Sequence, residues 1–141
     1  MTQISLAEAE AVIAGAFERG AVEGCAPLTV VVLDPGGHVV ALARADGSST
    51  LRPAIAIGKA ASALGLGMSS RKVGEMAADR PTFFAALGAI APHGLIPAAG
   101  GLIINGEDGS PIGAVGVTGD VSDNDEICAL AGIARAGLHT N

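Results

Sequence analysis

One stretch near the C-terminus decides the fold: Gly113-Ala-Val-Gly-Val-Thr-Gly119, followed by Asp120-Val-Ser-Asp-Asn-Asp-Glu126 and Ile127-Cys-Ala-Leu-Ala-Gly-Ile133. Its first part is apolar and β-branched, which predicts a buried strand over Pro111–Thr118. The glycine and the acids that follow predict a turn, and Ser122 with Asp125 three residues later predicts a helix capped at Ser122. We expect the helix to end at Gly137 and its inner face to carry Ile127, Leu130, Ala131 and Ala134.

The same kinds of signal divide the rest of the chain into short elements. Ser5-Leu-Ala-Glu8 is a capping box that predicts a helix from Leu6, ended by Gly20 or Gly24. We expect two hairpins, with strands Leu28–Leu33 and Val39–Arg44 in the first, and Leu102–Asn105 and Pro111–Thr118 in the second. Between the hairpins we expect a helix from Pro53 to about Leu66, a short helix over 71–78 capped by Ser70, and another over 82–89 after Pro81.

The order of these elements predicts the fold class. A helix, a hairpin, three helices, a second hairpin and a last helix show no strand–helix–strand alternation. We therefore expect an α+β fold in which an antiparallel sheet of four to five strands is covered by helices. Because no linker or low-complexity segment divides the sequence, residues 1–141 are interpreted as one domain.

Composition restricts the possible partners. The net charge is −6 and there is no basic run, which argues against binding to nucleic acid or to an anionic membrane surface. The N-terminal segment lacks the basic region of a signal peptide, so a cytoplasmic protein is expected. Cys25 and Cys128 are not spaced as metal ligands, and two buried thiols are favoured over a disulfide or a metal pair. No metal site is expected.

Five blocks of the chain, taken in order, are similar to those of a known family. They are Val30-Val-Val-Leu-Asp-Pro-Gly-Gly-His-Val-Val40, Arg44-Ala-Asp-Gly47, Ile55-Ala-Ile-Gly-Lys-Ala60, Gly100-Gly101 and Ile112-Gly-Ala-Val-Gly-Val-Thr-Gly119. Together they resemble the GlcG/HbpS-like haem-binding family, which includes the C-terminal domain of the PduO-type adenosyltransferase. No single block is specific, but their order and spacing extend over nearly the whole chain.

The resemblance implies a profilin-like arrangement of sheet and helices, assembled into homo-oligomers. It also implies a small-molecule-binding or haem-binding accessory protein of bacterial catabolism. Haem is therefore the cofactor to consider, although the chain offers only three Phe, and no Trp or Tyr, to line a haem site. The chain departs from the commoner pattern at Arg52, where many members carry a small polar residue, and this makes the expected ligand anionic.

Lys59 and Glu126 are the candidate catalytic residues. Lys59 is the only charged residue between Ala54 and Met68. In an apolar pocket its pKa would fall, so that it could act as a base, a Schiff-base amine or an anion anchor, whereas a structural lysine would extend to the helix edge. Glu126 or Asp123 could be the acid or base beside it. The alternative is that these acids only complement the dipole of the last helix.

The remaining candidates would bind the ligand. Arg44, Asp46 and Arg52 flank one loop, where the arginines could hold a carboxylate or a haem propionate. The alternative is that Arg44 and Asp46 form a local ion pair or hydrogen bonds that order the loop. Gly100 and Gly101 could present N–H groups to an anion, or could permit close backbone packing. His93, in a Pro-His-Gly loop, is the one histidine expected to reach a pocket, where it could be a haem ligand.

Two functions of different classes follow from these residues. The first is the small-molecule-binding or haem-binding accessory protein that the resemblance implies. The second is a cofactor-independent isomerase, lyase or hydrolase that acts on a small carboxylate-bearing metabolite through Arg44, Arg52 and Lys59.

Overall fold

The computed structural model of the chain describes residues 3–141; Met1 and Thr2, where the segment predicted not to be a signal peptide begins, lie outside them. Within the described range there are five helices and four strands. In chain order they are α1 (Leu6–Glu23), β1 (Thr29–Leu33), β2 (Val39–Arg44), α2 (Arg52–Leu66), α3 (Ser70–Asp79), α4 (Pro81–Leu87), β3 (Gly101–Asn105), β4 (Pro111–Thr118) and α5 (Ser122–Arg135). The predicted order of elements and the α+β class are confirmed.

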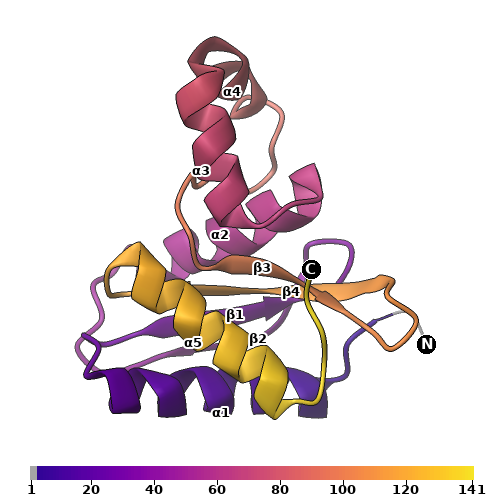
Figure 1. Cartoon of the computed structure of the whole chain (residues 1–141). Helices are drawn as coiled ribbons and strands as arrows, with labels where there is room; N and C mark the ends of the chain where they lie inside the picture. The colour runs from indigo at the N-terminus through magenta and orange to yellow at the C-terminus, as the bar shows by residue number, and fades with distance from the viewer. Residues whose placement is uncertain (1–2) are drawn as a thin grey trace.

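The four strands form one antiparallel sheet in the order β2-β1-β4-β3. Each hairpin supplies one edge strand and one central strand, and the hairpins join through β1 and β4, where Thr29 lies opposite Thr118. Helices α1 and α5 lie side by side on one face of the sheet, and α2 covers the other face (Figure 1). The chain therefore has three layers.

Alternating side chains on the central strands separate two cores. Val30, Val32, Val115 and Val117 face α1 and α5, whereas Val31, Leu33 and Ala114 pack with Ala56 and Ala60 of α2. Because both faces are covered, β1 and β4 are apolar along nearly their whole length, as the continuous apolar runs of the sequence predict.

Glycines allow the helices to lie very close to their neighbours. A Cβ added at Gly132 of α5 would lie 2.3 Å from the carbonyl oxygen of Val12 in α1, and one added at Gly116 of β4 would lie 2.0 Å from the carbonyl oxygen of Ala56 in α2. No side chain fits at those distances. The small-residue composition therefore reflects direct backbone contact between the layers.

Two predictions about helix starts hold, and two are wrong. Ser5 and Glu8 form the predicted capping box of α1, and Pro53 lies in the first turn of α2. The cap of α3 is Ser69 instead of Ser70. Ser122 is the first residue of α5 instead of its cap, and no side chain caps that helix.

The inner face of α5 also differs from the prediction. The buried residues are Asp125, Cys128, Ala129, Gly132 and Ile133. Ile127 and Leu130, predicted to be inside, are 37% and 43% exposed. Close contact with α1 requires small residues on the inner face. Asp125 is buried because it binds a residue of α2, on the other face of the sheet.

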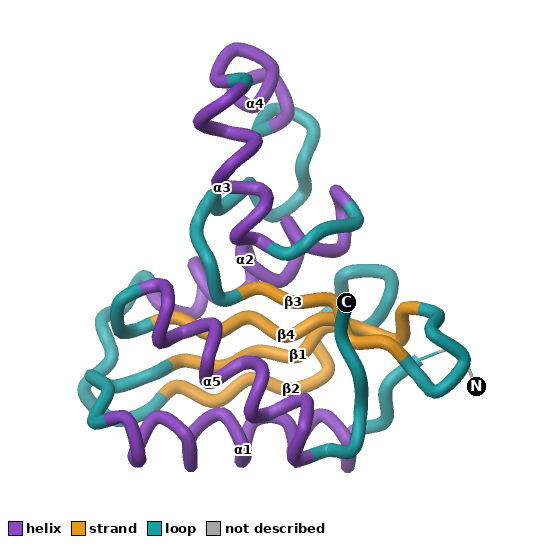
Figure 2. The backbone as a smooth tube through the Cα atoms, viewed as in Figure 1, coloured by secondary structure: helices purple, strands orange, loops and turns teal. Residues whose placement is uncertain are grey.

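Helices α3 and α4 form an arm that stands away from the sheet (Figures 1 and 2). The arm contacts the rest of the molecule mainly through α2 and the start of β3. The hydroxyl oxygen of Ser70 accepts a hydrogen bond from the N–H of Gly101 at 2.7 Å, which joins the base of the arm to the first residue of β3.

Candidate functional site

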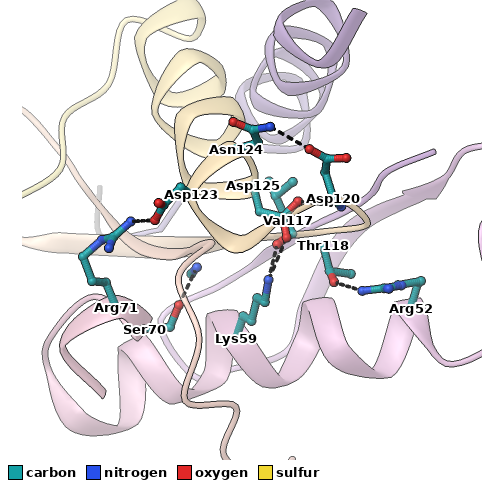
Figure 3. A network of polar contacts seen from close by, with 11 residues as sticks. Arg52, Lys59, Ser70, Arg71, Val117, Thr118, Asp120, Asp123, Asn124 and Asp125 are labelled. Atoms are coloured by element: carbon teal, nitrogen blue, oxygen red, sulfur yellow. Dashed lines mark hydrogen bonds and ion pairs between the residues drawn. The ribbon is translucent and has the colours of Figure 1, made fainter. Parts of the chain in front are cut away.

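A buried ion pair connects the helical layers on the two faces of the sheet. Lys59 extends from α2, and its Nζ donates to the Val117 carbonyl oxygen and to Asp125 Oδ2, both at 3.0 Å (Figure 3). The side chains of Lys59 and Asp125 are 3% and 1% exposed. The other carboxylate oxygen of Asp125 accepts the N–H of Asp120 at 3.0 Å. The pair therefore links the middle of α2 to the start of α5 and to the turn before it.

Two glycines make room for this lysine. A Cβ added at Gly100 would lie 3.0 Å from Lys59 Nζ and 2.4 Å from the Val117 carbonyl oxygen, and Gly100 has a φ of +128° that disfavours other residues. A Cβ at Gly101 would lie 2.2 Å from the backbone oxygen of Lys59. The glycine pair therefore permits close packing around Lys59, the alternative that the sequence left open.

In the Lys59–Asp125 pair, burial and the attraction between the two charges shift the pKa values in opposite directions. Burial lowers the pKa of the Lys59 ammonium and raises the pKa of the Asp125 carboxyl, while the attraction between the two groups acts against both shifts. The nearby Arg52 guanidinium lowers the pKa of Lys59 further. Lys59 is thus fully engaged inside the protein and does not face an open pocket in this structure.

The acids expected beside Lys59 lie elsewhere. Arg71 of α3 donates to Asp123 at 2.5 Å (Figure 3). It also donates to Glu126 at 3.1 Å. Arg71 and Asp123 are exposed, at 45% and 76%. The expected grouping of Lys59 with Glu126 or Asp123 is therefore wrong, because both acids bind Arg71 at the base of the arm. The partner of Lys59 is Asp125.

The predicted arginine group lies at the N-terminal end of α2. Arg52 donates to Thr118 Oγ1 at 2.8 Å, and Thr118, Thr29 and Arg44 occupy directly opposed positions on β4, β1 and β2. Arg44 and Asp46 are exposed. Within residues 3–141 no carboxylate pairs with either arginine, so the alternative of a local Arg44–Asp46 ion pair is wrong.

His93 lies at a different place, in the wall of an apolar cavity of about 250 Å³. The C-terminal half of α2, the end of α4 and the following loop form this cavity; its lining residues include Ala61, Leu66, Leu87 and Leu95. Ala61 is nine residues after Arg52 on α2, which corresponds to about 13 Å along the helix axis. The residues predicted to form one site therefore lie in three separate places. Lys59 is in the buried ion pair, Arg44 and Arg52 lie near the start of α2, and His93 lies at the apolar cavity.

Two classes of feature are not found in the described part of the chain. No group of three or more His, Cys, Asp or Glu side chains there is placed to hold a metal ion. No helix among residues 3–141 is long and apolar enough to cross a membrane.

Comparison with known families gives a match over residues 4–134 to the family described as haem-degrading protein HbpS-like. The chain belongs to this family. Membership confirms the resemblance that the five sequence blocks indicated and relates the chain to haem proteins. No curated protein matches the chain at a significant level.

Solved structures agree with the fold. HbpS of Streptomyces reticuli, solved as a double mutant, is 27% identical with a TM-score of 0.81, and the match covers 95% of this chain and 87% of that one. The protein ORFY of Klebsiella pneumoniae is 24% identical with a TM-score of 0.85, over 97% and 93% of the two chains. A complex of PduOC with haem is 19% identical with a TM-score of 0.85, over 99% of both chains. The comparisons give no support to the enzymatic alternative.

Sequence reasoning missed Asp125 as a site residue and considered it only as part of a helix cap. A signal for its role is present in the helix itself. Asp125 lies three and four residues before Cys128 and Ala129, which are both fully buried, so it shares their face of α5. An acid on a buried face requires a partner, and Lys59 is the matching isolated charge on a largely apolar helix.

Proposed function

We propose that this protein is a haem-binding accessory protein in which the apolar cavity beside His93 receives the haem. The observation that carries the proposal is the combination of a histidine and apolar walls in one cavity, in a member of a haem-related family. Histidine is a common axial ligand of haem iron, and apolar side chains suit the face of a macrocycle.

The cavity residues fit part of a haem. A volume of about 250 Å³ is slightly below the roughly 300–1,000 Å³ of typical ligand pockets. The cavity could therefore cover one part of the macrocycle, and the rest would need cover from elsewhere. Ile90 at the cavity is 78% exposed and offers apolar surface next to it. Bound haem would supply the iron chemistry; His93 and the apolar walls would bind and orient it.

Titration with haemin tests this proposal. We expect a saturable Soret shift at micromolar haemin, lost or strongly weakened in His93→Ala. His38→Ala and His139→Ala are matched controls because these two histidines do not line the cavity, and they should bind like the wild type. Ala61→Leu, which fills the cavity, should weaken binding without removing a ligand. No saturable shift would reject haem binding, and a shift that all these variants retain would reject the cavity.

The assembly is the second part of the proposal. Val39 and Leu42 on the edge strand β2 are 51% and 37% exposed, and Leu51 at the start of α2 is 63% exposed. These apolar side chains support the homo-oligomer that the family resemblance implies. Light scattering coupled to gel filtration measures the mass directly, and we expect Leu42→Glu to reduce it. A wild-type mass of one chain would reject the oligomer.

Arg44 and Arg52 would form a second site, which binds a small anionic ligand. Their lack of carboxylate partners within residues 3–141 supports this role, while their distance from the cavity indicates a separate contact. Calorimetric titration with succinate tests it. We expect salt-sensitive binding that Arg52→Gln abolishes and that Lys72→Gln, an exposed lysine on α3, leaves intact. Equal binding to all three proteins, or none to the wild type, would reject the site.

A further inference from the structure

The two cysteines of the chain meet where α1 and α5 pack together. Cys25 follows the residue that ends α1, and its N–H donates to the Gly20 carbonyl oxygen at 2.9 Å. Cys128 lies on α5 beside the same glycine, since a Cβ added at Gly20 would be 3.9 Å from Cys128 Sγ. The Cys25 side chain packs against the buried apolar cluster that contains Cys128. Both cysteines therefore lie around Gly20, and a disulfide bond would require their sulfur atoms to approach to roughly 2.05 Å.

The two thiols differ in access. Cys128 is fully buried, whereas Cys25 is partly exposed and lines a surface cavity of about 160 Å³. Phe17, Pro27 and Leu28 form other parts of this cavity. A cavity of this size admits molecules somewhat larger than water. A small neutral oxidant can therefore reach Cys25 from solvent, whereas Cys128 has no exposed surface.

We propose that Cys25 and Cys128 are a peroxide-sensitive dithiol site that closes to an intramolecular disulfide. In the first step the Cys25 thiolate attacks one oxygen of hydrogen peroxide, an S–O bond forms, the O–O bond breaks, and the leaving hydroxide takes a proton to become water. In the second step Cys128 Sγ attacks the sulfenic sulfur of Cys25, an S–S bond forms, the S–O bond breaks, and the departing hydroxide takes the Cys128 proton. Two thiols are oxidised, one peroxide is reduced, and two waters leave.

Burial and nearby negative charges determine how fast the two thiols react with peroxide. Burial and the Asp120 carboxylate raise the pKa of Cys25, and burial raises the pKa of Cys128 to about 12. Asp125 and Glu23 add negative charge near one or both thiols. Little thiolate exists at neutral pH, so the site responds slowly, and its rate rises with pH. The disulfide would join the end of α1 to α5 and close a loop of about a hundred residues.

Mass spectrometry of the peroxide-treated protein tests the site independently of haem. After treatment and alkylation under denaturing conditions, the wild type should have lost two hydrogen atoms and accept no alkyl group, and a reductant should reverse this. Cys128→Ala should instead accumulate a sulfenic acid on Cys25 that dimedone traps. In Cys25→Ser, Cys128 should remain a free thiol. Asp120→Asn, which keeps a hydrogen-bond acceptor for Ala26, should react several-fold faster than the wild type.

Other results would overturn the proposal. Two free thiols in the wild type after prolonged treatment at pH 8.5 would reject the site. A sulfinic acid on Cys25 without a disulfide would reject Cys128 as the second thiol. Oxidation of Cys128 in the Cys25→Ser variant at the wild-type rate would reject Cys25 as the point of attack. Disulfide-linked dimers would reject the intramolecular bond.

Discussion

Lys59→Met should destabilise the protein strongly, although it changes no surface contact. The substitution removes both hydrogen bonds of the ammonium and leaves the Asp125 carboxylate buried without its counter-ion. Removal of one partner from a buried ion pair lowers the free energy of unfolding by about 3–5 kcal/mol. We take this range to include the cost to the Val117 carbonyl, which also loses its hydrogen-bond donor. For a domain stable by about 5–15 kcal/mol, that is a large fraction of the free energy of unfolding.

Asp125→Asn should cost less, about 2–3 kcal/mol. The amide oxygen can still accept the N–H of Asp120, and Lys59 can release its proton because burial already lowers its pKa. The double variant leaves neither charge buried alone. The double variant should therefore lose less free energy of unfolding than the two single variants together. The difference should be about 2 kcal/mol, which is the coupling energy expected for groups in direct contact.

Urea denaturation followed by far-UV circular dichroism at pH 7 measures these values, since the chain has no Trp or Tyr for fluorescence. Lys72→Met is the matched control, because Lys72 is exposed on α3 and should change the free energy by no more than about 0.5 kcal/mol. A Lys59→Met loss below about 1 kcal/mol, or losses of the single variants that simply add, would refute the energetic role of the pair.

Three further predictions concern single positions. Burial raises the pKa of Cys128 from an ordinary value of 9.0 to about 12, so this thiol ionises first in the unfolded chain. The free energy of unfolding contributed by Cys128 should therefore fall by about 1.4 kcal/mol between pH 8 and pH 10, and urea denaturation of the reduced protein should show a correspondingly smaller loss in Cys128→Ala. Gly116→Ala should cost at least 1–3 kcal/mol through a clash with α2 in urea denaturation, whereas Gly65→Ala, where the added Cβ meets open space, should stabilise by about 0.5–1 kcal/mol. Ser70→Ala should cost about 1–3 kcal/mol, because the Gly101 N–H loses its buried acceptor, and hydrogen exchange at Gly101 should become faster.

Local sequence signals were sufficient for most of the fold. The capping box at Ser5, the Pro-Gly-Gly turn before Val39 and the apolar run of β4 each act within a few residues, so their elements could be predicted one by one. The wrong predictions depend on contacts between residues that lie far apart in the sequence. Hydropathy favoured Ile127 and Leu130 as the inner face of α5, but the space beside α1 admits only small residues such as Gly132.

The candidate site was less predictable for the same reason. Lys59 was recognised as an unusual charge, but its partner lies 66 positions away, and three nearby acids offered the same chemistry. Only the packing of α5 decides that Asp125 points inward while Asp123 and Glu126 point to Arg71. Arg44, Arg52 and His93 remain predictions, since their roles depend on a ligand.

The buried pair and the glycines beside it act as one unit. An ion pair inside a protein is rarely the most stabilising choice, because two apolar side chains of similar volume often do as well. What apolar side chains could not provide here is a link that bonds a strand carbonyl and both helical layers at once, as Lys59 does with Val117 and Asp125. That link requires a gap at the sheet edge, and Gly100 supplies it by having no Cβ. The lysine therefore positions the start of α5 relative to α2, and with it the acids that bind the base of the arm.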